Sequence, residues 1–150
     1  MDWRSLLRSV EAIVGGGGKR DEKLKKISRL LKENITHYDW VGFYLVGEEP
    51  GVLYLGPFTG SPTEHVRIPF GRGICGQAAE REVTFVVQDV SKETNYLSCS
   101  PDVRAEIVVP IFKDGKVVGE IDIDSLQPSP FTDKDREFLE RVAGLVSNLF

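Results

Sequence analysis

Residues 106–125 read EIVVPIFKDGKVVGEIDIDS, and this stretch decides the fold. Two runs rich in valine and isoleucine, with apolar residues at every second position, flank the turn segment 113–115. Alternation of this kind is typical of β-strands with one buried face, and a glycine in a short connection is typical of a hairpin. We therefore expect an antiparallel sheet that contains this hairpin.

Two registers of the hairpin are open. A two-residue loop, Asp114-Gly115, puts Lys113 opposite Lys116. A three-residue loop puts Phe112 opposite Lys116 and leaves the glycine in the left-handed position of a bulged turn. Only the second register places the alternating apolar residues of both strands on one face. We therefore predict that Phe112 pairs with Lys116.

That register gathers three carboxylates near one end of the other face. Glu106 is expected opposite Asp122, and Asp124 opposite Arg104. Like charges directly opposed in a sheet are unfavourable, so a cation, a shared proton or a bound ammonium group should offset them. Two interpretations stay open: a solvated face neutralised by Arg104, or a site for a cationic or zwitterionic ligand or for a general acid with a raised pKa. The sequence offers no ligand-rich loop for a divalent metal, and no metal is expected.

Outward from the hairpin, helical spacing of apolar residues marks both ends of the chain, and period-two segments lie between them. The expected fold class is α+β, a single domain over residues 1–150 with a central antiparallel sheet of about six strands and N- and C-terminal helices packed on it. Its expected parts are a helical N-terminal segment at about 1–35, interrupted by the glycines 15–18, a sheet and pocket at about 38–125, a short helix at 73–82 and a C-terminal helix at about 132–149.

The composition excludes several classes of protein. The chain has 150 residues, a net charge of −4 and a pI near 5.3, which argues against general nucleic-acid binding. No apolar run approaches the ~20 residues of a membrane span, and the first residues, MDWRSLLRSV, lack the apolar core of a signal peptide. Two cysteines are too few for a disulfide scaffold, so a cytoplasmic protein is expected.

A glycine-rich turn, GRGICG at 71–76, matches the GxGxxG pattern of dinucleotide-binding folds. No parallel βαβ unit follows it, so we do not expect it to bind a nucleotide. It does place a helix N-terminus beside Cys75, which favours a thiolate or another anion there.

The other cysteine, Cys99, lies within residues 89–104, which show no clear strand or helix period. Connections this long inside a compact domain are often functional, and a thiol in one is accessible. By residue type a zinc site is also conceivable, but the chain lacks the short ligand pairs of structural zinc sites; its members would be His37, His65, Cys75 and Cys99.

From about residue 24 to residue 150 the chain resembles the GAF-domain free methionine-(R)-sulfoxide reductases. The segments that carry the resemblance are 38–44 (YDWVGFY), 56–58 (GPF), 67–76 (RIPFGRGICG), 106–110 (EIVVP) and 119–125 (GEIDIDS). The resemblance implies that Cys99, seven residues before Glu106, is the nucleophile and that Cys75 resolves its sulfenic acid as a disulfide. The implied substrate-binding residues are Glu106, Asp122, Asp124, Trp40 and Tyr44.

The resemblance also implies the partners. These are free methionine sulfoxide or another small zwitterionic ligand and a thioredoxin-like reductant, with no cofactor. Apart from the resemblance, the apolar terminal helices are expected to allow a homodimer, and the charge and apolar runs given above predict no nucleic-acid or membrane partner. Many family members carry a further cysteine ten residues before that of the glycine turn, where this chain has His65. Cys75 is then the one internal partner for Cys99. The alternative is a non-catalytic GAF sensor or binding module for a small ligand.

Overall fold

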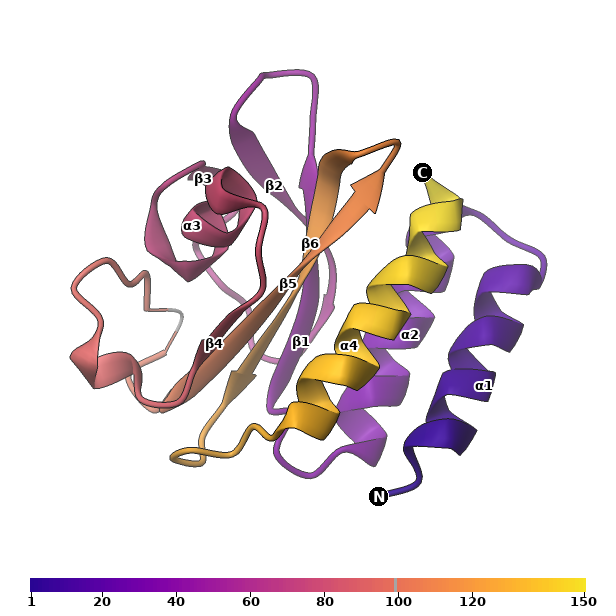
Figure 1. Cartoon of the computed structure of the whole chain (residues 1–150), viewed down its shortest axis with the longest axis horizontal. Coiled ribbons are helices and arrows are strands. Elements are labelled where there is room, and N and C mark those ends of the chain that lie inside the picture. The colour runs from indigo at the N-terminus through magenta and orange to yellow at the C-terminus, as the bar shows by residue number, and fades with distance from the viewer. Residues whose placement is uncertain (99) are drawn as a thin grey trace.

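Six strands form one antiparallel sheet in the order β3-β2-β1-β6-β5-β4 (Figure 1). The computed structural model describes residues 1–98 and 100–150. The long strands β1, β6 and β5 lie in the middle of the sheet and supply its buried residues. The strand bounds are β1 Trp40–Val46, β2 Val52–Thr59, β3 Arg67–Pro69, β4 Phe85–Val87, β5 Ala105–Lys113 and β6 Lys116–Ser125.

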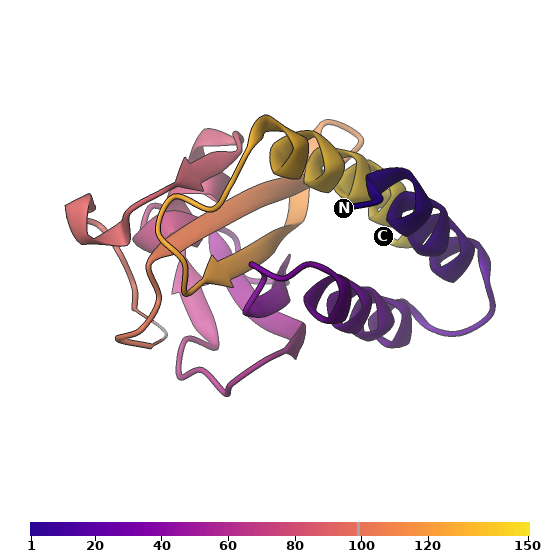
Figure 2. The same cartoon turned by 90° about the horizontal axis from the view of Figure 1, so that it is seen from below.

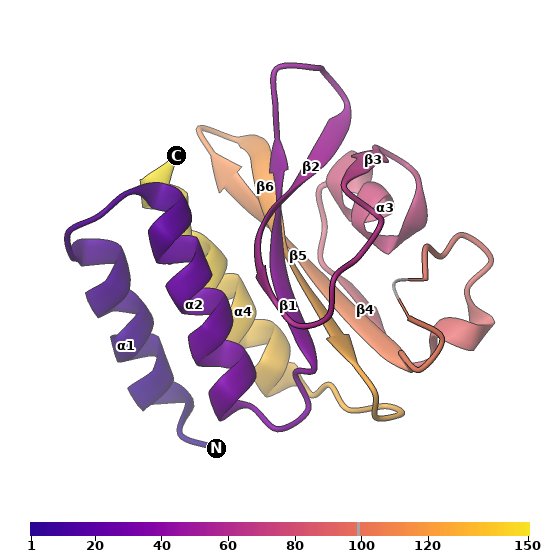
Figure 3. The same cartoon turned by 180° about the vertical axis from the view of Figure 1, so that it is seen from behind.

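The helices divide between the two faces of the sheet (Figures 1 and 2). On one face α2 (Arg20–Asn34) and α4 (Asp133–Val146) pack on the strands, and α1 (Trp3–Gly15) packs on these two helices from outside. The other face is covered by α3 (Gly73–Arg81). Figure 3 shows α3 on the opposite side of the sheet from α1, α2 and α4. Short 3₁₀ turns at Val90–Lys92 and Ser147–Leu149 complete the described elements.

Each face of the sheet carries its own apolar core. The larger core joins the three terminal helices to inward residues such as Ile107, Ile121 and Ile123. The smaller core joins α3 to the opposite face and contains Tyr44, Cys75 and Val108. The α+β class, the antiparallel sheet and the helices packed on it are thus confirmed. None of the helices in the described chain is long and apolar enough to cross a membrane.

A buried carboxylate holds α4 against the segment that leads into β1. Asp135 accepts a hydrogen bond from the Thr132 backbone at 2.8 Å and one from the Tyr38 hydroxyl at 2.8 Å. Its Oδ1 also lies 2.7 Å from His37 Nε2. His37 therefore belongs to the helical side of the molecule, and the zinc site that combined it with His65 and the cysteines is wrong.

The predicted register at the hairpin turn is wrong. Lys113 pairs with Lys116, so the loop has two residues. Asp114 and Gly115 have φ angles of 52° and 78°, the two positive values that a type I′ turn requires. Phe112 consequently pairs with Val117.

A bulge restores the predicted facing of the side chains. The register shifts between Ile111 and Phe112, so that Ile111 pairs with Gly119 and Val118 is the extra residue of β6. One extra residue reverses the alternation, and the apolar residues of both strands return to one face. The correct facing therefore arises from a tight turn and a bulge, where we expected a longer turn and regular strands.

The bulge also changes the partners of the carboxylates. Glu106 pairs with Asp124, and Val108 stands opposite Asp122. The expected pairs of Glu106 with Asp122 and of Asp124 with Arg104 are wrong, because each strand position is displaced along its partner. Arg104 is exposed, and its backbone N–H donates to the Ser125 carbonyl at 2.8 Å.

Candidate functional site

The face of the sheet beneath α3 carries four buried carboxylates. Glu106 comes from β5, and Glu120, Asp122 and Asp124 come from alternate positions of β6. Their exposed fractions are 5%, 0%, 1% and 2%. A solvated face neutralised by Arg104 is therefore wrong. Glu120 is absent from the predicted site, although its position two residues before Asp122 on a strand could have indicated it.

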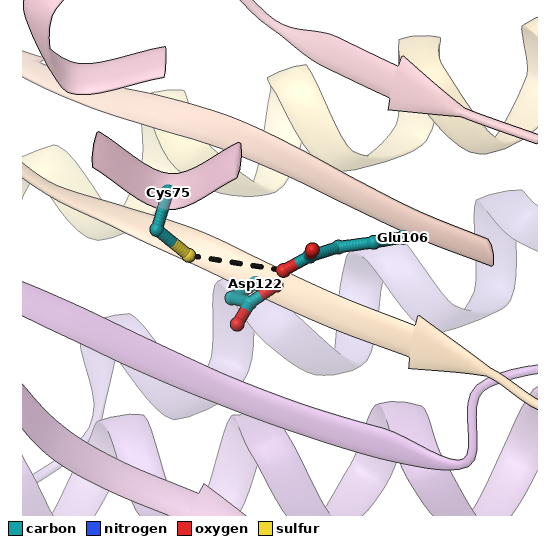
Figure 4. A group of neighbouring side chains, drawn as sticks. All are labelled: Cys75, Glu106 and Asp122. Carbon is teal, nitrogen blue, oxygen red and sulfur yellow. Dashed lines mark hydrogen bonds between the residues drawn. The ribbon is translucent and has the colours of Figure 1, made fainter. Parts of the chain in front are cut away.

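Three elements bring a thiol and two of these carboxylates together (Figure 4). Cys75, on the first turn of α3, points its Sγ at Glu106 Oε2 on β5, at 3.8 Å. Asp122 on β6 completes the group, since one ligand atom from each residue lies within 4.8 Å of the others. Cys75 is a free, buried cysteine.

Burial dominates the electrostatics of this group. Burial raises the pKa of the Cys75 thiol well above its ordinary value, and the negative charges of Asp122, Glu120 and Glu106 add to the effect. The pKa is raised although Cys75 lies on the first turn of α3. The expectation that the helix favours a thiolate at Cys75 is therefore wrong, and Cys75 is held as a neutral thiol.

Two of the carboxylates are held toward their neutral form. Burial raises the pKa of Asp122, although hydrogen bonds to Glu106 and Cys75 and the charge of His65 partly oppose it. Burial also raises the pKa of Glu120 well above its ordinary value, and the charge of Asp122 adds to this. A carboxyl group held toward its protonated form at neutral pH is suited to act as a general acid.

The predicted site residues line two separate cavities. A small cavity of about 10 Å³, enough for one water-sized group, is bordered by Tyr44, Cys75, Glu106 and Asp122. A larger cavity of about 160 Å³ is bordered by Trp40 and Asp124 together with Asp39 and Asp102. The expectation that Trp40 and Tyr44 line one cavity is therefore not met. Their rings stack, with centroids 6.5 Å apart, and each ring borders one of the two cavities.

The glycine turn anchors the long segment that precedes Cys99. The Asn95 side chain accepts a hydrogen bond from the Gly73 N–H at 2.8 Å and donates to the Gly71 carbonyl at 2.7 Å. A Cβ at Gly73 would stand 2.8 Å from Leu97 Cγ, so only glycine lets the segment approach this closely. The GxGxxG pattern thus serves loop packing inside an antiparallel fold. Sequence reasoning missed Asn95.

Cys99 itself lies outside the described residues. Its neighbours Leu97 and Ser100 border the small and the larger cavity, respectively. His65, which also borders the small cavity, has its Nε2 2.8 Å from the Ser98 carbonyl oxygen. The His65 carbonyl accepts a hydrogen bond from the Tyr44 hydroxyl at 2.8 Å. His65 thus links the cavity wall to the residue before Cys99.

Trp40 is fixed from both sides. Its indole N–H donates to the Ser61 carbonyl at 2.9 Å, and its ring stacks on Phe58 with centroids 5.4 Å apart. A Cβ at Gly42 would lie 2.4 Å from the Trp40 ring, and one at Gly60 would lie 2.5 Å from it. Two glycines therefore leave the space that this ring occupies.

Comparison with known proteins agrees with this architecture. Residues 19–149 match the family model of the GAF domain. The chain belongs to the GAF-domain family, in the branch that includes free methionine-R-sulfoxide reductases.

The relatives in that branch cover nearly the whole chain. Free methionine-R-sulfoxide reductase of Saccharomyces cerevisiae is 43% identical over 95% of this chain and 82% of its own length. The protein of the same name from Escherichia coli is 36% identical over 93% of this chain and 83% of its own length. The crystal structure of the Neisseria meningitidis free methionine-R-sulfoxide reductase in complex with its substrate is 38% identical, with a TM-score of 0.93 over 99% of this chain and 87% of that one.

Proposed function

We propose that the chain is a thiol-dependent reductase of free L-methionine-(R)-sulfoxide. The observation that carries the proposal is the meeting of Cys75, Glu106 and Asp122 at one small cavity. The carboxylates can supply the proton that sulfoxide reduction requires, and the Cys75 thiol can resolve an oxidised cysteine. The relationship to the yeast enzyme, at 43% identity, supports the same activity.

The two cavities suit different parts of a zwitterionic amino acid. The larger one has room for the body of the substrate, with the Trp40 ring against its apolar groups and Asp124 near its ammonium. The small one accepts only a water-sized group, which corresponds to the sulfoxide oxygen, next to Asp122 and Glu106. We infer that the substrate bridges the two cavities.

In the first step the Cys99 thiolate attacks the sulfoxide sulfur. Asp122 donates a proton to the sulfoxide oxygen, because its raised pKa keeps it toward the protonated form. The protonated oxygen then passes to the Cys99 sulfur: the sulfoxide S–O bond and the transient S–S bond break, and a Cys99 S–O bond forms. Methionine is released, reduced by two electrons, and Cys99 is oxidised by two electrons to a sulfenic acid. Cys75 is unsuited to the first attack, since its own pKa is raised by burial.

In the second step the Cys75 sulfur attacks the sulfenic sulfur of Cys99. A disulfide forms, the sulfenic S–O bond breaks, and the hydroxyl group leaves as water with the proton of the Cys75 thiol. An external dithiol of the thioredoxin type then reduces the disulfide. The sum is sulfoxide plus dithiol giving methionine, water and the oxidised donor.

Mass spectrometry after addition of free methionine-(R)-sulfoxide tests the proposal. We expect a Cys75–Cys99 disulfide that forms in step with methionine. Cys99→Ser should form neither product in a single turnover. Cys75→Ser should form one equivalent of methionine and then lose steady turnover with thioredoxin, while dithiothreitol restores it. Unchanged thiols and no methionine in the wild type would refute the reductase and favour a small-ligand binding module.

A further inference from the structure

We propose that Cys75, Glu106 and Asp122 form a binding site for a divalent cation of the zinc class, with Glu120 as a third carboxylate beside it. Within residues 1–98 and 100–150, these three side chains place one ligand atom each within 4.8 Å of the others. All three are buried, and Figure 4 shows them converging from α3, β5 and β6.

The spacing is close to what a tetrahedral metal requires. Zinc bonds of about 2.3 Å to sulfur and 2.0–2.2 Å to oxygen place neighbouring ligand atoms roughly 3.5 Å apart. Cys75 Sγ already lies 3.8 Å from Glu106 Oε2. The three ligand atoms, all within 4.8 Å of one another, must therefore draw closer by roughly 1 Å to reach the spacing of a tetrahedral zinc site.

Glu120 gives the independent evidence for a cation. It is fully buried, and no described residue other than Cys75 supplies its carboxylate oxygens with a hydrogen-bond partner. Its charge acts on the Cys75 thiol, so it lies against the same group. Glu120 borders neither cavity, so a substrate seated in them does not reach it. The Oδ1 atom of Asp122 is also buried and has no hydrogen-bond partner among the described residues, so the group holds acceptor atoms that a cation would satisfy.

The donor set selects the kind of cation. Calcium and magnesium take oxygen ligands, whereas a thiolate sulfur favours zinc and its neighbours in the first transition row. Metal binding releases the Cys75 proton to solvent, since the ligand is the thiolate. The bound ion then offsets the charges of Glu106, Asp122 and Glu120.

Metal and substrate compete for the same groups. Cys75, Glu106 and Asp122 all border the small cavity, so an ion bound there occupies the position of the sulfoxide oxygen. The ion also blocks the sulfur that would resolve Cys99. Zinc should therefore inhibit the reductase; this consequence rests on the proposed function, whereas the metal site does not.

Cobalt substitution tests the site without measuring catalysis. The full chain is reduced with a phosphine, freed of metal, and titrated with Co²⁺ and with Zn²⁺ by absorption and calorimetry. We expect one ion per chain and a thiolate-to-cobalt charge-transfer band. Cys75→Ser should abolish the band, and Glu120→Gln should weaken binding by about 10- to 100-fold. The matched thiol control is Cys99→Ser, which should bind cobalt with the wild-type band and affinity.

Three outcomes would overturn the metal site: no uptake at micromolar metal, an unchanged band in Cys75→Ser, or loss of the band in Cys99→Ser. The two proposals fail separately. Cobalt binding with no methionine formed leaves the metal site standing and refutes the reductase. Methionine formation without cobalt binding does the reverse. Competition between Zn²⁺ and methionine sulfoxide is expected only where both hold.

Discussion

Replacing Glu120 by methionine should stabilise the metal-free protein. The Glu120 side chain is fully buried on β6, opposite Tyr44 of β1 and Pro110 of β5. No described residue other than Cys75 supplies its two carboxylate oxygens with a hydrogen-bond partner. A methionine side chain has nearly the same length, adapts its shape, and brings no polar atom that needs a partner.

The size of the effect follows from the lost partners. A buried polar group left unsatisfied costs about 1–3 kcal/mol, and that cost disappears with the carboxylate. In a domain of this size 1 kcal/mol moves the Tm by roughly 2–4 °C. We therefore expect the Tm of Glu120→Met to rise by roughly 3–10 °C at pH 8.

The gain should depend on pH. A carboxyl group with a raised native pKa contributes its stability below the ordinary glutamate range and loses it as pH rises through the native value. As pH rises, ionisation of Glu120 therefore lowers the free energy of unfolding of the wild type by up to about 1.4 kcal/mol per pH unit. The variant lacks Glu120 and does not have this pH-dependent loss. The advantage of Glu120→Met should accordingly be larger at pH 8 than at pH 5.

Calorimetry in the presence of a chelator measures both quantities. Glu33→Met, at an exposed position of α2, is the matched control and should leave the Tm nearly unchanged at both pH values. Glu120→Gln, which removes the charge and keeps the shape, separates poor packing from the electrostatic effect. If both Glu120 variants melt below the wild type at pH 8, the carboxylate has a stabilising partner and the reasoning is wrong.

Three further changes test the walls of the site. Asp122→Asn should lower kcat for free methionine-(R)-sulfoxide by about 10²-fold or more, measured in single turnover, because the proton donor is lost. His65→Gln should move the basic limb of the kcat/KM pH profile upward, since the His65 charge lowers the pKa of Asp122. Gly42→Ala should raise KM and shift tryptophan fluorescence, because the new Cβ would lie 2.4 Å from the Trp40 ring; unchanged values would show that the ring does not contact substrate.

Periodicity predicted the architecture because burial has a simple geometric form in these elements. In the hairpin, every second residue is apolar and lies on the buried face, as in Ile107, Val109, Ile121 and Ile123. In α4 the apolar residues likewise form one stripe, which packs into the same core. The turn was predicted less well. Two combinations, a three-residue loop with regular strands and a two-residue loop with a bulge, give the same facing of side chains. The hydrophobic pattern cannot distinguish them, and the positive φ of Asp114 belongs only to the second.

The site was predicted where its residues repeat along a strand and missed where contacts are long-range. Asp122 and Asp124 are two apart on β6, so their shared face follows from the pleat. Asn95 and His65 act through hydrogen bonds to Gly73 and Ser98, 22 and 33 residues away. Only the fold brings such pairs together, and an asparagine or a histidine in the sequence does not indicate which distant residue it contacts. The division into two cavities likewise depends on the positions of Trp40 and Tyr44 across the sheet.

The buried carboxylates on this face of the sheet lower the stability of the empty domain, and a bound ligand can offset that loss. An apolar residue at Glu120 or Asp122 would pack against α3 as Val108 does, without the cost of desolvation. A ligand that supplies positive charge or a proton acceptor recovers that cost only when it is bound. Because it binds the native state alone, it raises the free energy of unfolding by RT ln(1 + [L]/Kd). Because of the carboxylates beneath α3, the ligand-bound domain gains stability that the empty domain lacks. Each substitution of these carboxylates that stabilises the empty protein should therefore lower its affinity for the ligand.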